Sequence, residues 1–164
     1  MPAQAPNRDT VCALAVMAKA PRTGEVKTRL VPPLAPQEAA QLSECFLRDI
    51  AANFIAAAGE ARIHAYVAYS PPGSETLFRE LVPPAVQLLP PRRAGLGHSL
   101  LHASEDLLTA GYGAACLVNA DSPTLPTSLL LRAVEALSMP GERVVLGPAL
   151  LLAPSGVAGS MIAK

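Results

Sequence analysis

The amino-acid sequence predicts an α/β protein of three layers (α/β/α), in which helices cover both faces of a mostly parallel, doubly wound sheet. Short apolar runs rich in β-branched residues alternate with longer segments whose apolar residues repeat at helical spacing. Clusters of Gly, Pro and polar residues separate these segments. Strands that alternate with helices in this way form parallel sheets, because each helix returns the chain to the starting edge of the sheet.

The 164 residues are expected to form one domain, because domains commonly contain about 100–200 residues. With 51% hydrophobic and 16% charged residues, the chain is too apolar for a disordered protein. Thirteen basic residues balance thirteen acidic ones, and Trp is absent, so neither a basic field nor a stacking surface indicates a nucleic-acid partner. Any anion-binding site must therefore be local.

Two strands and two helices are predicted in the first half of the chain. The strands cover residues 10–18 and 63–69, a loop covers residues 19–34, and the helices cover residues 36–58 and 74–81. Pro36 suits the first turn of the long helix, and Gly59 is placed to end it. Ser74 is placed to cap the short helix.

Three strands and two helices are predicted in the second half. The strands cover residues 85–89, 114–119 and 143–147, and the helices cover residues 97–110 and 127–138. Right-handed crossovers favour an order in which the first strand lies between the second and the fourth. The chain then reverses direction between strands 10–18 and 114–119, where ligands of open α/β sheets bind.

The loop after the first strand carries a local excess of positive charge. Lys19, Arg22, Lys27 and Arg29 lie within eleven residues that contain one acid, Glu25. Cationic side chains and free backbone N–H groups in a Gly-containing loop suit a polyphosphate. The segment is neither a Walker A loop nor a dinucleotide fingerprint. The alternative interpretation is a loop whose charges only contact solvent.

The loop after the fourth strand, residues 120–126, contains Asp121. A carboxylate that faces a polyphosphate indicates Mg²⁺ or Mn²⁺, because these cations take oxygen ligands and share phosphates. The alternative is that Asp121 forms an Asx-turn at the start of the next helix.

Four segments of the chain resemble motifs of one protein superfamily. They are MAKAPRTGEVKTRL at residues 17–30, GLG at 95–97, ADSP at 120–123 and VVLGPA at 144–149. Together they are similar to a bacterial, glycosyltransferase-like branch of the GT-A-type nucleotide-diphospho-sugar transferases, the branch that resembles 2-phospho-lactate guanylyltransferase. The similarity covers nearly the whole chain and implies a GT-A, Rossmann-like fold.

The resemblance also implies an activity and its residues. The ligand would be a nucleoside triphosphate or nucleotide sugar, with Mg²⁺ or Mn²⁺. The phosphates would be contacted by the loop cations Lys19, Arg22, Lys27 and Arg29. Asp121 would hold the metal and act with Lys27 in catalysis. Gly95 and Gly97 would allow close approach of the nucleotide, and Asn119 stands where the wider superfamily has an acid.

The sequence departs from the family pattern after residue 149. The family continues into an Asp-Gly-Gly-Tyr-Tyr-like segment, whereas this chain has no acid after Glu142 and an apolar tail over residues 150–164. The tail could cap the sheet, pack in a homo-oligomer interface, or mark a truncated or frame-shifted product. A non-catalytic phosphate-binding or assembly subunit is therefore the alternative to a transferase.

Two further groups of side chains are weighed as ligand contacts. His98, His102 and Asp106 could form a metal-binding face, but the apolar stripe of that helix, which includes Leu101, places them mainly on the solvent side. Arg92 and Arg93 could reach a nucleotide, but a solvent-exposed loop is the preferred interpretation.

The compartment is expected to be the cytoplasm, without a membrane partner. The three cysteines, Cys12, Cys45 and Cys116, are too far apart to suggest a metal site or disulfide framework. No apolar run is long enough to span a bilayer. Residues 11–18 are a weak candidate for a signal peptide, because Asp9 precedes them and the basic region is poor.

Overall fold

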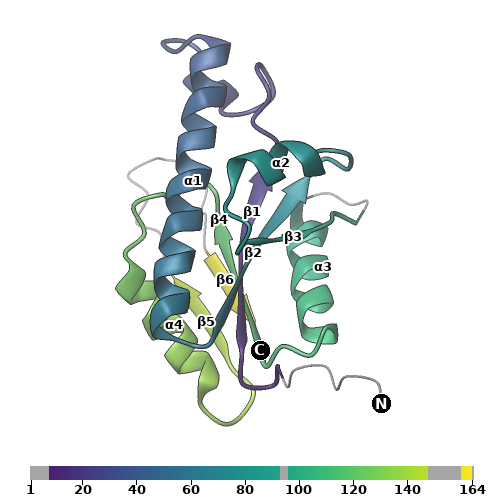
Figure 1. The fold of residues 1–164 in the computed structure, drawn as a ribbon, viewed down its shortest axis with the longest axis vertical. Helices are drawn as coiled ribbons and strands as arrows, with labels where there is room; N and C mark the ends of the chain where they lie inside the picture. The colour runs from purple at the N-terminus through teal and green to yellow at the C-terminus, as the bar shows by residue number, and fades with distance from the viewer. Residues whose placement is uncertain (1–7, 93–95, 148–159, 164) are drawn as a thin grey trace.

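The computed structural model describes residues 8–92, 96–147 and 160–163, and confirms the predicted α/β/α architecture. Figure 1 shows the sheet between its helices. The sheet contains β1 (Cys12–Lys19), β2 (Ile63–Ser70), β3 (Gln87–Leu89), β4 (Ala114–Asn119), β5 (Val144–Gly147) and β6 (Ser160–Ala163). The helices are η1 (Thr28–Leu30, a 3₁₀ turn), α1 (Pro36–Glu60), α2 (Glu75–Leu81), α3 (Leu96–Thr109) and α4 (Thr127–Ser138).

The strand order is β3-β2-β1-β4-β6-β5, and β3, β2, β1 and β4 are parallel, as the crossover rule predicts. In the register of these strands, Lys19 lies opposite Ser70, and Met17 lies opposite Asn119. The loops that follow β1 and β4 therefore leave the sheet at the same edge.

The C-terminal tail contributes a strand that the sequence did not predict. Residues 160–163 form β6, which is antiparallel to both β4 and β5 and separates them. Part of the tail therefore belongs to the sheet of its own chain, which corrects the view of the whole tail as a cap or an interface segment. The rest of the tail, residues 148–159 and 164, lies outside the described residues.

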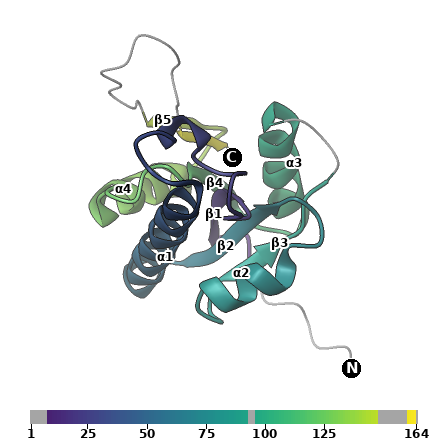
Figure 2. The ribbon, with the colours of Figure 1, turned by 90° about the horizontal axis from the view of Figure 1, so that it is seen from above.

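The helices are divided unequally between the two faces of the sheet (Figure 2). Residues of α1, α2 and α4 pack in one apolar cluster with Leu14 and Val16, whereas α3 packs in another with Ala13 and Ala15. This division follows from the alternation of side chains along β1. Among the described residues, no helix combines the length and apolar character needed to cross a membrane.

Two predicted helix ends are wrong in detail. Gly59 lies inside α1, which continues to Glu60 because the helical hydrogen bonds do not require a left-handed residue there. Ser74 precedes α2 but makes no side-chain cap. Its buried hydroxyl accepts a hydrogen bond from the Arg22 guanidinium at 3.2 Å instead.

Candidate functional site

A cavity of about 660 Å³ lies at the carboxyl ends of the parallel strands. Its wall includes the ends of β1, β2 and β4, the segment after β3, and one side of α3. Ligand pockets commonly have volumes of about 300–1,000 Å³, so a nucleotide-sized molecule fits the space. Lys19, Lys27 and Asp121, three of the predicted site residues, line it.

The segment after β1 folds back toward the cavity through a tight turn. Gly24 adopts a positive φ of 77°, and the backbone N–H of Glu25 donates to the carbonyl of Arg22 at 3.0 Å. A positive φ is accessible to glycine without steric cost. Lys19 Nζ donates to the Glu25 carbonyl at 2.9 Å, which ties the end of β1 to the turn.

Lys27 is held from several sides. Its backbone has the left-handed conformation, with φ of 48°, and its side chain is 10% exposed. The ammonium group lies 4.2 Å from the centroid of the Phe46 ring on α1, close enough for a cation–π interaction. Nζ also lies 2.5 Å from Oδ1 of Asp121. The cation is thus fixed at the cavity wall, beside the carboxylate that the sequence singled out.

The loop after β4 presents the Asp121 carboxylate to the cavity. The side-chain oxygen of Asn119 accepts a hydrogen bond from the backbone N–H of Asp121 at 3.2 Å. This is an Asx-turn made by Asn119, whereas the Asp121 carboxylate contacts Lys27 rather than the backbone at the start of α4. The carboxylate of Asp121 is 67% exposed and remains accessible to a ligand as well as to Lys27.

The other predicted phosphate contacts lie elsewhere. Arg22 points to Ser74, and Arg29 is an exposed residue of η1; neither lines the cavity. The run of four cations therefore divides into two that face the cavity and two that do not. Gly97 lies in the first turn of α3, whereas Gly95 and Arg93 fall outside the described residues.

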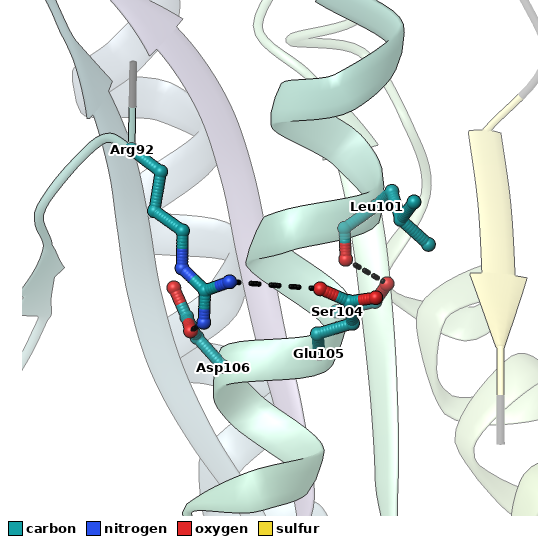
Figure 3. Close-up of polar contacts among 5 residues, drawn as sticks. All are labelled: Arg92, Leu101, Ser104, Glu105 and Asp106. Carbon is teal, nitrogen blue, oxygen red and sulfur yellow. Dashed lines mark hydrogen bonds and ion pairs between the residues drawn. The ribbon is translucent and has the colours of Figure 1, made fainter. Parts of the chain in front are cut away.

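Arg92 joins the opposite wall of the cavity to α3 (Figure 3). Its guanidinium forms an ion pair with the Asp106 carboxylate and lies 3.6 Å from a carboxylate oxygen of Glu105. The preferred interpretation of Arg92 as a loop residue without a role is therefore incomplete. Arg92 and Asp106 therefore balance each other in the cavity lining, as the two lysines Lys19 and Lys27 are balanced by the carboxylates of Glu25 and Asp121.

The orientation of α3 corrects the predicted inward stripe. Leu101 is 49% exposed, whereas His102 and Asp106 line the cavity. His98 is exposed, as expected. His102 Nδ1 is buried and makes no hydrogen bond with the described residues. The spacing of His102 and Asp106 in the sequence had indicated that they share one face of the helix. The apolar pattern had instead placed Leu101 toward the core and these two residues toward solvent.

Tyr69 also lines the cavity, and the charges that act on its hydroxyl are those of Glu75 and Arg79 on α2. Burial raises the pKa of its hydroxyl, and the charge of Glu75 raises that pKa further. The hydroxyl therefore keeps its proton at neutral pH.

The groups around Asp121 fit a divalent cation that is shared with a ligand. Mg²⁺ usually retains several waters and is held by one or two carboxylates together with substrate phosphates. Asp121 supplies one exposed carboxylate beside Lys19 and Lys27. Within residues 8–92, 96–147 and 160–163, no three His, Cys, Asp or Glu side chains are grouped to hold a metal ion. A cation that arrives with phosphates fits this site, whereas a cage made by protein alone is not formed by the described residues.

Comparison with known proteins supports the assignment of the fold. The model of a family described as "Uncharacterized protein conserved in bacteria (DUF2064)" matches residues 52–150. The crystal structure of a candidate nucleotide-diphospho-sugar transferase from Desulfovibrio desulfuricans G20 superposes with a TM-score of 0.77 at 23% sequence identity. The match covers 92% of this chain and 62% of that one. No curated protein sequence matches the chain.

Proposed function

Because the chain belongs to the bacterial family DUF2064 and has the fold of a nucleotide-diphospho-sugar transferase, we propose that it binds a nucleoside triphosphate or nucleotide sugar and transfers a nucleotidyl or glycosyl group. The observation that carries the proposal is the meeting of Lys19, Lys27 and Asp121 at one cavity. Lys19 is the last residue of β1, and Lys27 and Asp121 lie in the two loops that flank the point where the strand order reverses.

Each of these groups has a distinct role in the proposal. Lys27 and Lys19 neutralise and orient the phosphates. Asp121 helps to hold Mg²⁺ or Mn²⁺, which when bound stabilises the negative charge on the phosphates. Rate acceleration then comes from positioning and charge stabilisation. Arg29 is exposed on η1, next to the loop, and would add a longer-range attraction for the donor.

The resemblance to 2-phospho-lactate guanylyltransferase makes guanylyl transfer one specific form of this proposal. Glycosyl transfer from a nucleotide sugar is the other form, and it agrees with the description of the Desulfovibrio neighbour. The two forms share the phosphate-binding wall and differ in the acceptor.

A phosphate-binding protein without catalytic activity is the alternative. The observation that favours it is that no three metal-ligating side chains are grouped around Asp121 or elsewhere among the described residues. Such a protein would bind polyphosphates equally well with and without a divalent ion.

A thermal-shift panel distinguishes these proposals. The four nucleoside triphosphates and common nucleotide sugars are each added with Mg²⁺, Mn²⁺ or EDTA. A ligand at about 100 times its dissociation constant stabilises a protein by roughly 2.7 kcal/mol, or a few degrees. A shift that requires the metal supports the transferase, and a shift that EDTA does not change supports the alternative. No shift with any ligand contradicts both.

Two variants test the residues. Asp121→Asn is expected to remove the metal dependence of nucleotide binding, and an unchanged response to metal would exclude Asp121 from the site. Arg29→Ala is expected to weaken donor binding modestly, because the side chain is exposed and screened by salt. Unchanged affinity at low salt would exclude Arg29.

A further inference from the structure

Lys27 and Asp121 contact each other directly, although they are proposed to hold different parts of the ligand. Nζ of Lys27 lies 2.5 Å from Oδ1 of Asp121. The ammonium group therefore occupies one of the two oxygens that could bind a metal ion, and its positive charge repels a divalent cation at that place. The carboxylate in turn offsets the charge that Lys27 would offer to a phosphate.

We propose that Lys27 is a latch on Asp121, which closes the carboxylate to divalent metal until a polyphosphate draws the ammonium group away. The latch is the contact between these two side chains. This inference rests on the proposed function, because it assigns an order of events to the same site. Polyphosphate and metal then bind with positive coupling, and each raises the affinity for the other by the same factor.

The environment of the two residues differs in a way that suits a latch. Lys27 is 10% exposed and lies over the Phe46 ring, in a left-handed backbone conformation that few non-glycine residues adopt. Asp121 is 67% exposed. The lysine is thus preorganised at the wall of the cavity, whereas the carboxylate is free to turn from the ammonium group toward a cation in the cavity.

The polar groups next to Lys27 and Asp121 are engaged in contacts of their own. Lys19 already donates to the Glu25 carbonyl, and Asn119 is engaged with the backbone of Asp121. Both contacts involve backbone atoms and neither includes Lys27, so they do not depend on the contact between Lys27 and Asp121. Release of Lys27 therefore opens the Asp121 carboxylate without dismantling the loop that carries it.

The size of the effect follows from the exposure of the pair. Couplings between two ligands commonly amount to about 5- to 150-fold in affinity. Exposed ion pairs lie at the weak end of charge interactions. Because Asp121 is mostly exposed, we expect removal of the latch to raise the affinity for Mn²⁺ alone by about five- to tenfold.

The test measures Mn²⁺ binding to the protein without nucleotide, from the electron paramagnetic resonance signal of free Mn²⁺. Lys27→Met keeps an unbranched side chain of similar length beside Phe46 and removes the charge. Lys27→Gln is a second variant with the same loss of charge. Arg29→Met is the matched control, because it removes one positive charge from the same loop but does not contact Asp121. Melting curves check that each variant is folded.

Tighter Mn²⁺ binding by either folded Lys27 variant, with little change in Arg29→Met, supports the latch. The double variant Lys27→Met/Asp121→Asn must then lose the gain, because the carboxylate is the proposed site. Unchanged Mn²⁺ affinity in the Lys27 variants, an equal gain in Arg29→Met, or a gain that survives Asp121→Asn overturns the latch.

The outcomes separate the latch from the proposed function. If the wild-type protein binds nucleotides with metal but Lys27→Met leaves Mn²⁺ binding unchanged, the function stands and the latch is wrong. If Lys27→Met gains affinity for Mn²⁺ but no nucleotide stabilises the wild-type protein, the contact controls a metal site and the proposed function is wrong.

Discussion

The Thr127 hydroxyl at the start of α4 donates a hydrogen bond to the side-chain oxygen of Asn53 on α1 at 2.6 Å. The amide nitrogen of Asn53 donates to the Leu125 carbonyl at 2.7 Å. One side chain on α1 thus holds the end of the loop that begins after β4 and carries Asp121. This anchor is partly buried, so its hydrogen bonds are costly to lose.

We expect Asn53→Ala to lower the free energy of unfolding by about 1–3 kcal/mol, because a partly buried hydroxyl and a carbonyl lose their partner. Asn53→Asp retains the acceptor for Thr127 and should lose less. Urea unfolding measures both changes. Ala52→Ser, at the exposed neighbouring position, is the control and should change stability little. Equal effects of Asn53→Ala and the control would show that the anchor is not stabilising.

Gly113 and Gly59 are expected to respond to alanine in opposite directions. A Cβ at Gly113 would lie 1.9 Å from the backbone oxygen of Asp9, so the backbone must shift. Gly113→Ala should destabilise the protein by about 1–3 kcal/mol, the usual cost of overpacking. A Cβ at Gly59 in α1 meets nothing within 4 Å, so Gly59→Ala should stabilise by up to about 1 kcal/mol. Melting temperatures measure both, and a stable Gly113→Ala variant would contradict the clash.

The three thiols should differ in reactivity and in their effect on stability. Cys45 is exposed, whereas Cys12 and Cys116 are buried. Ellman's reagent should therefore modify one thiol quickly in the native protein and three after unfolding. Rapid modification of all three without denaturant would contradict the burial.

Burial also raises the pKa of Cys12 from 9.0 to about 12 and raises that of Cys116. The folded state keeps protons that the unfolded chain releases as the pH rises. The contribution of the buried thiol to the free energy of unfolding is therefore fully present below about pH 9 and is lost as the pH rises toward 12. The free energy of unfolding should fall across this range. Cys12→Ala should reduce the slope, and an unchanged slope would show that Cys12 is not its source.

The variant Asp106→Asn tests the cavity wall on which Asp106 forms an ion pair with Arg92. The variant removes a negative charge from the cavity and releases Arg92 from one of its two acids. Binding of pyrophosphate should tighten about two- to fivefold at low salt and less at high salt, since exposed charges are screened. Glu80→Gln on α2, outside the cavity, is the charge-matched control. Isothermal titration measures affinity, and equal gains in both variants would indicate net charge alone.

The order of strands and helices could be predicted because it depends on local patterns. The elements 114–119 and 127–138 coincide with β4 and α4, and crossover handedness correctly places β1 between β2 and β4. Strand β6 could not be predicted in the same way. It is four residues long, and its position between β4 and β5 depends on pairing with strands distant in the sequence.

The candidate site was predicted in part for a similar reason. The composition of two loops and the switch point of the sheet identified Lys19, Lys27 and Asp121. The sequence did not distinguish Lys27 from Arg22 and Arg29, because turn geometry decides which cation faces the cavity. It also placed His102 toward solvent, because an apolar stripe near the helix start was assigned without knowledge of how α3 packs.

The sequence by itself determined the secondary elements other than η1 and β6, the parallel order of four strands and the sheet edge where charged loops meet. These features follow from periodicity, turn residues and chain handedness, which act over short distances or apply to every α/β sheet. Tertiary structure alone decided that Lys27 contacts Asp121, 94 residues away, and that Arg92 pairs with Asp106. Such contacts depend on the packing of distant elements and on the direction of individual side chains, which no local pattern encodes.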